Sequence, residues 1–277
     1  MKKSLILGLL VLAVTCLSIP AAHFTINCGK YSVLIGNGGL PLRMSYDGVA
    51  ISQSVSYTIQ LPTEDGSPGI RFVIPNSKLD KTTSIDVTRD GEAVSELSGK
   101  IEGHEVKVVR TSQCENLKTT FSTLVTDKNI TISTQYETTG EQGLVGLYAI
   151  TIHWDHASVD WLAKMQNESF ASGKFESNNG FFLHRTNQRT LWYALLFPES
   201  KIGAVTVLDD DTAMAGGCRF WDRALPNNHQ MIYQVNLPKT LSADFKTAVY
   251  KMIISAFPAT AETLQAEATK IAEPEEE

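Results

Sequence analysis

The residues whose types best fit a chemical role lie between positions 219 and 233. His229 and Tyr233 could each take a proton, and Arg219 could neutralise a carboxylate. A polyuronide lyase needs this combination, because its base removes the proton next to a sugar carboxylate. These three residues are therefore candidate catalytic residues. Trp221 and Arg223 in the same segment are candidate ligand contacts, through ring stacking and charged hydrogen bonds.

A second group of aromatic and basic residues lies between positions 181 and 193. His184 and Arg185 follow two phenylalanines, and Trp192 comes shortly afterwards. Aromatic rings stack on the apolar side of a pyranose, and Arg or His donates to its hydroxyls or carboxylate, so these three residues are candidate ligand contacts. The alternative is that Trp192 is a core residue and Arg185 a solvated strand end.

A third group, His153-Trp-Asp-His156, is the densest polar and aromatic cluster. Two histidines three residues apart could bind a metal on a helix, but this segment is expected to end a strand, where positions three apart face opposite sides. No metal site is therefore expected, and His153 is instead a candidate donor to a sugar hydroxyl. The sequence also lacks a phosphate-binding glycine loop and a Gly-x-Ser-x-Gly elbow, so no cofactor is expected.

Alternating apolar and polar residues, broken by turn signals, are the commonest local pattern. Leu40, Leu42, Met44 and Tyr46 are expected to share one face of a strand, and Asp47-Gly48 to close a hairpin with the strand that returns at Val49–Ser52. Asp90-Gly91 repeats this turn. Further strands are expected over Leu144–His153, Gly180–Arg185, Leu191–Leu196, Lys201–Leu208, Gln230–Leu237 and Phe245–Ala256. The pattern is typical of half-buried antiparallel sheets, so an all-β sandwich is predicted.

Helical spacing is confined to two segments, Ser158–Met165 and Thr260–Ala272. Neither a long repeat nor a Pro/Gly/Ser-rich linker is present. We therefore expect three parts: a signal peptide over residues 1–22, a β-sandwich domain over 23–258, and a C-terminal helix with an acidic tail over 259–277.

The first 22 residues have the layout of a secretory signal peptide. Lys2 and Lys3 precede an apolar run over 5–17, and Pro20 and the small residues Ala21 and Ala22 follow. The run is shorter than the roughly 20 residues that span a bilayer, so cleavage near Ala22 is favoured over an anchor helix, and no membrane span is expected elsewhere. A periplasmic or secreted location follows.

Charge and cysteine content exclude further classes. The net charge is −6 and no Lys/Arg cluster is present, so nucleic acid is not an expected partner. Cys28, Cys114 and Cys218 remain after residue 22, and no CxxC pair occurs. Two interpretations fit these cysteines: a disulfide between two of the three, or three buried thiols.

Three stretches give the chain a resemblance to a known superfamily. Tyr31–Ile51, with its Gly38-Gly39 break and its Tyr46-Asp47-Gly48 turn, resembles the opening of galactose mutarotase-like proteins. The strand pair over 117–155 and the loop and strand over 220–233 are similar to later parts of that fold. The resemblance implies an antiparallel β-supersandwich with a concave sheet that binds a carbohydrate.

The resemblance also implies an epimerase with histidines and a late glutamate base, but the expected last core strand, Phe245–Ala256, contains no carboxylate. The leading interpretation is an exported protein that binds or processes an oligo- or polysaccharide. The alternatives are a structural or interaction module of the cell envelope without a small ligand, and an enzyme, either a lyase or an epimerase.

Overall fold

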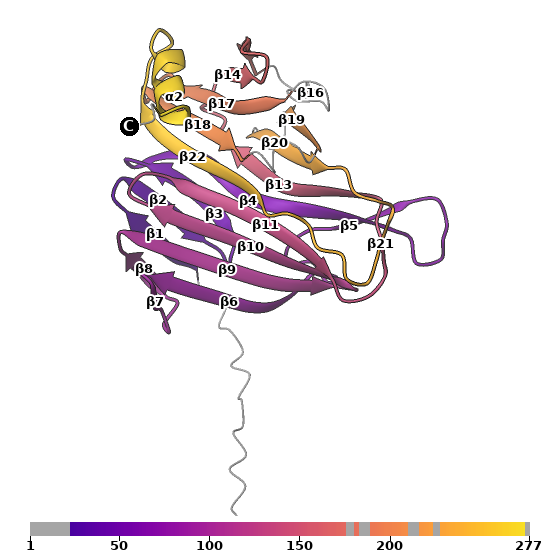
Figure 1. Ribbon diagram of the computed structural model, residues 1–277. Coiled ribbons are helices and arrows are strands. Elements are labelled where there is room, and N and C mark those ends of the chain that lie inside the picture. Colours follow the sequence, from indigo (N-terminus) through magenta and orange to yellow (C-terminus); the bar gives the residue numbers. More distant parts are fainter. Residues whose placement is uncertain (1–22, 176–179, 183–188, 210–215, 224–227, 275–277) are drawn as a thin grey trace, which may run out of the picture.

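The computed structural model describes residues 23–175, 180–182, 189–209, 216–223 and 228–274. These residues form two large β-sheets that pack face to face, with a short helix near the C-terminus (Figure 1). Within the described ranges all strand pairs but one are antiparallel, the exception being β1 with β8. The prediction of an antiparallel β-sandwich with a C-terminal helix is therefore confirmed.

The first sheet has nine strands in a continuous order and a tenth, β5, that pairs with β4 beyond them. In spatial order its strands are β16 (Gly180–Phe182), β19 (Gly216–Arg223), β20 (Asn228–Val235), β13 (Gly146–Trp154), β4 (Val49–Pro62), β3 (Pro41–Tyr46), β2 (Tyr31–Ile35), β1 (Phe24–Cys28) and β8 (Gly99–Glu102), with β5 (Ile70–Val73) against β4.

The second sheet also has ten strands, and a separate two-stranded ribbon joins two loops. The second sheet runs β15 (Phe170–Lys174), β14 (Asp160–Met165), β17 (Thr190–Phe197), β18 (Ile202–Leu208), β22 (Tyr250–Pro258), β11 (Ile130–Thr138), β10 (Leu117–Thr126), β9 (Glu105–Cys114), β6 (Lys81–Arg89) and β7 (Glu92–Ala93), and the ribbon pairs β12 (Gln142–Gly143) with β21 (Thr240–Leu241).

The main core lies between the sheets, where every second residue of a strand points inward. Strand β10 buries its residues at alternate positions along its whole length, as period-2 geometry requires. Tyr57 of the first sheet packs against Phe121 and Tyr136 of the second, with ring centroids 6.2 and 6.3 Å away. Aromatic pairs of this kind join the two layers.

Two of the predicted turns are present. Tyr46 pairs with Val49 across Asp47 and Gly48, which have φ angles of 50° and 81°. Arg89 pairs with Glu92 across Asp90 and Gly91 in the same way, with φ angles of 51° and 87°. Positive φ at both central positions is what a two-residue hairpin requires.

The predicted helix over Ser158–Met165 is wrong. Residues 160–165 form strand β14, which pairs with β15 on one side and β17 on the other. The helix-favouring Leu, Ala, Lys and Met of this segment are overridden by these two ladders, because propensity is a weak determinant beside tertiary pairing.

The C-terminal helix is present but shorter than predicted. α2 spans Leu264–Ala272 and lies beside β17 and β18 (Figure 1). Leu264 and Ala268 are its buried residues, and they cover a second apolar cluster on the outer face of the second sheet, with Trp192, Ala194, Leu196, Val205 and Phe257. The expected signal peptide and the last three residues of the acidic tail lie outside the described residues.

Candidate functional site

A groove of about 730 Å³ lies on the outer face of the first sheet, over β20, β13 and β4. Its lining residues come from these strands, from the start of β3, and from β5 with the loop that follows it. They are Leu40, Pro41, Leu42, Ser54, Val55, Ser56, Thr58, Phe72, Ile74, Pro75, Asn76, Tyr148, Thr151, His153, Gln230 and Ile232. The size is within the range of small-molecule sites in proteins.

The floor of the groove is polar because of the alternation in β4. Ser54, Ser56 and Thr58 alternate with residues that are buried in the main core, namely Val55, Tyr57 and Ile59. Successive strand residues face opposite sides, so the three hydroxyl side chains are on the outer face. A row of hydroxyls can both donate and accept hydrogen bonds, which suits a ligand rich in hydroxyl groups.

His153 and Gln230 lie side by side in this floor. They are register partners in the β13–β20 ladder, and their side chains meet with Gln230 Nε2 3.2 Å from His153 Nδ1. With the amide nitrogen as donor, Nδ1 accepts and the neutral ring carries its proton on Nε2. The sequence-based candidate His153 is therefore in the groove, in a strand and not at a loop rim.

The wall of the groove is apolar and exposed. The exposed fractions are 60% for Phe72, 53% for Ile74 and 40% for Leu42. Leu42 was expected to share a face with Met44, which is fully buried; instead the register is irregular on both sides of β3, and Leu42 turns outward. An exposed ring beside a hydroxyl-rich floor is the combination that pyranose binding uses.

A buried ion pair holds the loop after β5 that continues this wall. Asp80 and Arg110 form an ion pair with no exposed side-chain surface, and Tyr57 donates a hydrogen bond of 2.9 Å to Asp80 Oδ1. The backbone N–H of Asn76 donates to Asp80 Oδ2 at 3.0 Å. Burial raises the pKa of the Tyr57 hydroxyl well above its ordinary value, so this group stays a donor.

Two of the candidate catalytic residues face the interior instead of the groove. His229 is 8% exposed, its Nε2 lies 2.9 Å from the Ser158 carbonyl oxygen, and its ring stacks on Phe175 with centroids 3.9 Å apart. Tyr233 is 0% exposed. The two residues are four apart in β20, so they share the inner face, opposite Gln230 and Ile232. This placement corrects the expectation that they meet a ligand.

Trp192 is also a core residue, as one of the two interpretations held. It is 1% exposed, belongs to the cluster beneath α2, and donates from Nε1 to Glu273 Oε1 at 2.8 Å. The expectation that it stacks on a ligand is corrected by its burial on the other sheet.

The remaining candidates are only partly described. His184 and Arg185 lie outside the described residues. Arg219, Trp221 and Arg223 are described through their backbone in β19, where their register partners in β20 are Ile232, Gln230 and Asn228, respectively. Two of these partners, Ile232 and Gln230, line the groove.

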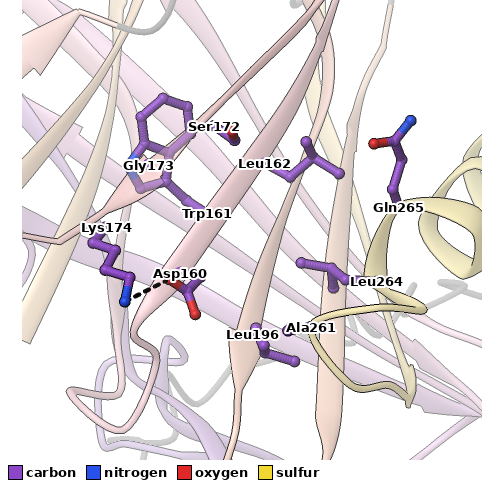
Figure 2. A pocket seen from close by; sticks show the side chains of 10 residues that line it. All are labelled: Asp160, Trp161, Leu162, Ser172, Gly173, Lys174, Leu196, Ala261, Leu264 and Gln265. Carbon is purple, nitrogen blue, oxygen red and sulfur yellow. Dashed lines mark ion pairs between the residues drawn. The ribbon is translucent and has the colours of Figure 1, made fainter.

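A second hollow, of about 530 Å³, lies between β14, β15 and α2 (Figure 2). Lys174 and Asp160 approach to 4.0 Å at one side of it, and Leu162, Leu196 and Leu264 belong to the apolar cluster under the helix. Two of its polar side chains, Lys174 and Asp160, pair with each other, whereas the first groove offers a row of hydroxyls beside His153 and Gln230, so the first groove is the better candidate site.

The described residues contain no cluster of His, Cys, Asp and Glu that could hold a metal ion. Cys28 and Cys114 are buried free thiols, and the side chain of Cys218 is outside the described atoms. The described part of the chain also has no helix long and apolar enough to cross a membrane.

No known family model matches the chain, and no curated protein is similar to it in sequence. Solved structures do match. A galactose mutarotase-like protein from Lactobacillus casei superposes with a TM-score of 0.52 at 8% identity, over 85% of this chain and 100% of that chain. The chain has the galactose mutarotase-like fold.

The same fold occurs within larger enzymes. The GH36 α-galactosidase AgaB from Geobacillus stearothermophilus superposes with a TM-score of 0.59 at 10% identity, over 88% of this chain and 41% of that one. A variant of AgaA from the same organism, solved with stachyose, gives 0.57 at 11% identity, over 90% and 42%. The chain thus spans about two fifths of the length of these α-galactosidases.

The groove residues other than His153 were not identified from the sequence. One available signal was the Ser54-x-Ser56-x-Thr58 alternation, which places three hydroxyls on one face of a strand. Phe72 carried no comparable signal, because its exposure follows from the pairing of the short strand β5 with the end of β4; Ile74 comes directly after that strand.

Proposed function

We propose that this chain is an exported protein that binds a carbohydrate in the groove on the outer face of the first sheet. The observation that carries the proposal is the composition of that groove. Its floor offers Ser54, Ser56, His153 and Gln230 for hydrogen bonds, and its wall offers the exposed ring of Phe72. Sugars present the matching pair of surfaces, hydroxyls at the ring edge and C–H groups on the ring face.

The structural neighbours support a carbohydrate as the ligand class, since they include α-galactosidases and galactose mutarotase-like proteins. Because the sequence identity to these neighbours is low, they show the fold only. The argument for a carbohydrate ligand comes from the side chains of the groove. Export rests on the layout of residues 1–22, where a basic start is followed by a short apolar run and small residues.

Binding is favoured over catalysis by the titratable groups of the groove. Among the described lining residues these are His153 and Tyr148, and no carboxylate is present. An epimerase or a lyase needs a general acid and a general base within hydrogen-bond reach of the protons that they move. His229 and Tyr233, the candidates for a lyase, lie on the inner face of β20.

The interaction-module alternative expects His229, Arg219 and Trp192 to point in unrelated directions. His229 and Trp192 lie in different sheets, and the side chain of Arg219 is outside the described atoms. The apolar wall formed by Leu42, Phe72 and Ile74 could also contact a protein. The hydroxyl-rich floor favours the carbohydrate, because a protein-binding surface centres on apolar residues with its polar groups at the rim.

A glycan array probed with the purified protein tests the proposal, together with Phe72→Ala and Ile70→Ala. Both side chains are exposed on β5, but Ile70 does not line the groove. We expect binding to at least one glycan class, a several-fold loss with Phe72→Ala, and no loss with Ile70→Ala. Absence of binding to every glycan by a folded protein would overturn the proposal. Export is tested separately by measuring the mass of the protein secreted from cells. The mass should correspond to a chain whose first residue is near His23.

A further inference from the structure

A third hollow, of about 340 Å³, lies on the same outer face as the groove, over β1, β2 and β3. It is lined by Thr25, Ser32, Leu34, Arg43, Ser45 and Gly48. Three of these residues carry hydroxyls and one carries a permanent positive charge, and the lining contains no acidic side chain. The hollow therefore has the chemistry of an anion site.

The strand register explains why these side chains converge. Thr25 pairs with Leu34 across β1 and β2, and Leu34 pairs with Arg43 across β2 and β3, so the three form one row. Ser32 pairs with Ser45 in the adjacent row on the same face. Directly paired side chains lie about 5 Å apart and diagonal neighbours about 7–8 Å, so Arg43 stands beside Leu34, with Ser32 and Ser45 in the next row and Thr25 one strand further away.

The charge of Arg43 has no counter-ion among the residues that the structure describes. Arg43 is exposed, and it makes no ion pair or hydrogen bond with any residue that the structure describes. The nearest basic residue along the chain that does have a partner, Lys30, pairs with Asp47 at 3.2 Å. Elsewhere in this acidic chain, Arg71 is bound by Glu64 and Glu115, and Arg110 by Asp80. Arg43 is thus available for an external anion.

The hollow continues the groove. Leu42 lines the groove and the next residue, Arg43, lines the hollow, so strand β3 is their shared border. His153 on β13 and Arg43 on β3 are separated by β4 alone in the sheet order. Two strand spacings amount to about 10 Å, which one extended ligand of more than one sugar ring can bridge.

We propose that the Arg43 hollow is a subsite for an anionic sugar, one that bears a carboxylate or a sulfate, and that the groove and the hollow together bind an acidic oligosaccharide. Arg43 forms the charged hydrogen bonds, Ser32, Ser45 and Thr25 bind the remaining oxygens, and Leu34 contacts the C–H groups of the ring. This inference rests on the proposed function and names its ligand class.

The test is calorimetric titration of the purified protein with oligogalacturonate, with a chondroitin sulfate oligosaccharide, and with a neutral galactan oligosaccharide of similar length. The variants are Arg43→Gln, Arg43→Lys and, as a matched control, Arg89→Gln, which removes an exposed arginine from the second sheet. We expect one of the acidic probes to bind more tightly than the neutral one. Arg43→Gln should then weaken that acidic probe by about tenfold or more, since a hydrogen bond to a charged group is lost.

The remaining variants and probes show which results would contradict the inference. Arg43→Lys should restore part of the affinity, and neither the neutral probe in Arg43→Gln nor any probe in Arg89→Gln should change. Equal binding of neutral and acidic probes, or an Arg43→Gln effect matched by Arg89→Gln, would overturn the anionic subsite and leave groove binding intact. If none of the three probes binds, and the glycan array is also blank, both the subsite and the proposed function fail.

Discussion

The Asp80 carboxylate accepts a hydrogen bond from the backbone N–H of Asn76, and this 3.0 Å bond connects the fully buried Asp80–Arg110 pair to the wall of the groove. Ile74 and Pro75 precede Asn76 in the same wall. A core interaction therefore fixes the position of side chains that lie on the surface.

Removing one member of this pair should destabilise the protein strongly. Asp80→Asn leaves the Arg110 guanidinium buried without its counter-ion, and breaking a buried pair in this way costs about 3–5 kcal/mol. Urea unfolding should show this loss, whereas Lys30→Ala, which breaks the exposed pair with Asp47, should leave the unfolding free energy nearly unchanged. Equal effects of the two substitutions would show that the buried pair does not have this role.

The stability of the fold should fall at alkaline pH. Burial raises the pKa of the Cys28 thiol and that of the Cys114 thiol from an ordinary value of 9.0 to about 11, and raises the pKa of the Tyr31 hydroxyl to about 12. A group whose pKa is raised by folding stabilises the fold fully when the pH is below its pKa in the unfolded chain. This stabilisation is lost as the pH rises through its pKa in the folded protein. The decline should therefore lie between about pH 9 and pH 12.

Urea unfolding at pH 7, 9 and 11 measures this decline. The double variant Cys28→Ala/Cys114→Ala should show a shallower decrease between pH 9 and 11 than the parent protein, since its two thiols no longer titrate. If the two proteins lost stability with pH in the same way, the decline could not be assigned to the Cys28 and Cys114 thiols.

The C-terminal helix should stabilise the sandwich through one leucine. Leu264 is buried against the cluster that contains Phe257, Trp192 and Leu196, so Leu264→Ala should lower the unfolding free energy by about 2–3 kcal/mol. Gln265→Ala, at the next and exposed position of the helix, is the matched control and should change it little. If both variants lost a similar amount of unfolding free energy, the stabilisation would come from the helix as a whole and not from the Leu264 contact.

His229 should have a structural role and no role in ligand binding. Its ring stacks on Phe175 and bonds the Ser158 carbonyl, so His229→Ala should cost about 1–3 kcal/mol of stability. At a temperature where the variant is folded, its affinity for the glycan that the array identifies should equal that of the parent. A specific loss of affinity, or loss of an unsaturated product from uronate polymers, would restore the lyase hypothesis.

Much of the fold could be predicted from the sequence, because period-2 burial and two-residue turns are local. Asp47-Gly48 and Asp90-Gly91 fixed two hairpins through their positive φ angles. The segment over 158–165 could not be assigned correctly, since its conformation depends on β15 and β17, which lie elsewhere in the chain.

The site was less predictable for the same reason. Strand β20 alternates between an inner face with Met231, Tyr233 and Val235 and a more polar outer face with Gln230, so the burial of Tyr233 follows from its period-2 pattern. That pattern does not show that the outer face lies under a groove, because the groove depends on strands from elsewhere in the chain. His153 was identified from its neighbours in the sequence. Phe72 required the three-dimensional pairing of β5 with β4.

The most direct test of groove binding is to fill the groove and measure the affinity for the array-identified glycan by calorimetry. Ser56→Trp places an indole on the floor, and Ser122→Trp places the same ring on the outer face of the second sheet as its matched control. If the groove binds the sugar, Ser56→Trp should weaken binding by more than tenfold while the unfolding midpoints of the two variants stay similar, and Ser122→Trp should bind as the parent does. Undiminished affinity of a folded Ser56→Trp protein would contradict the central claim.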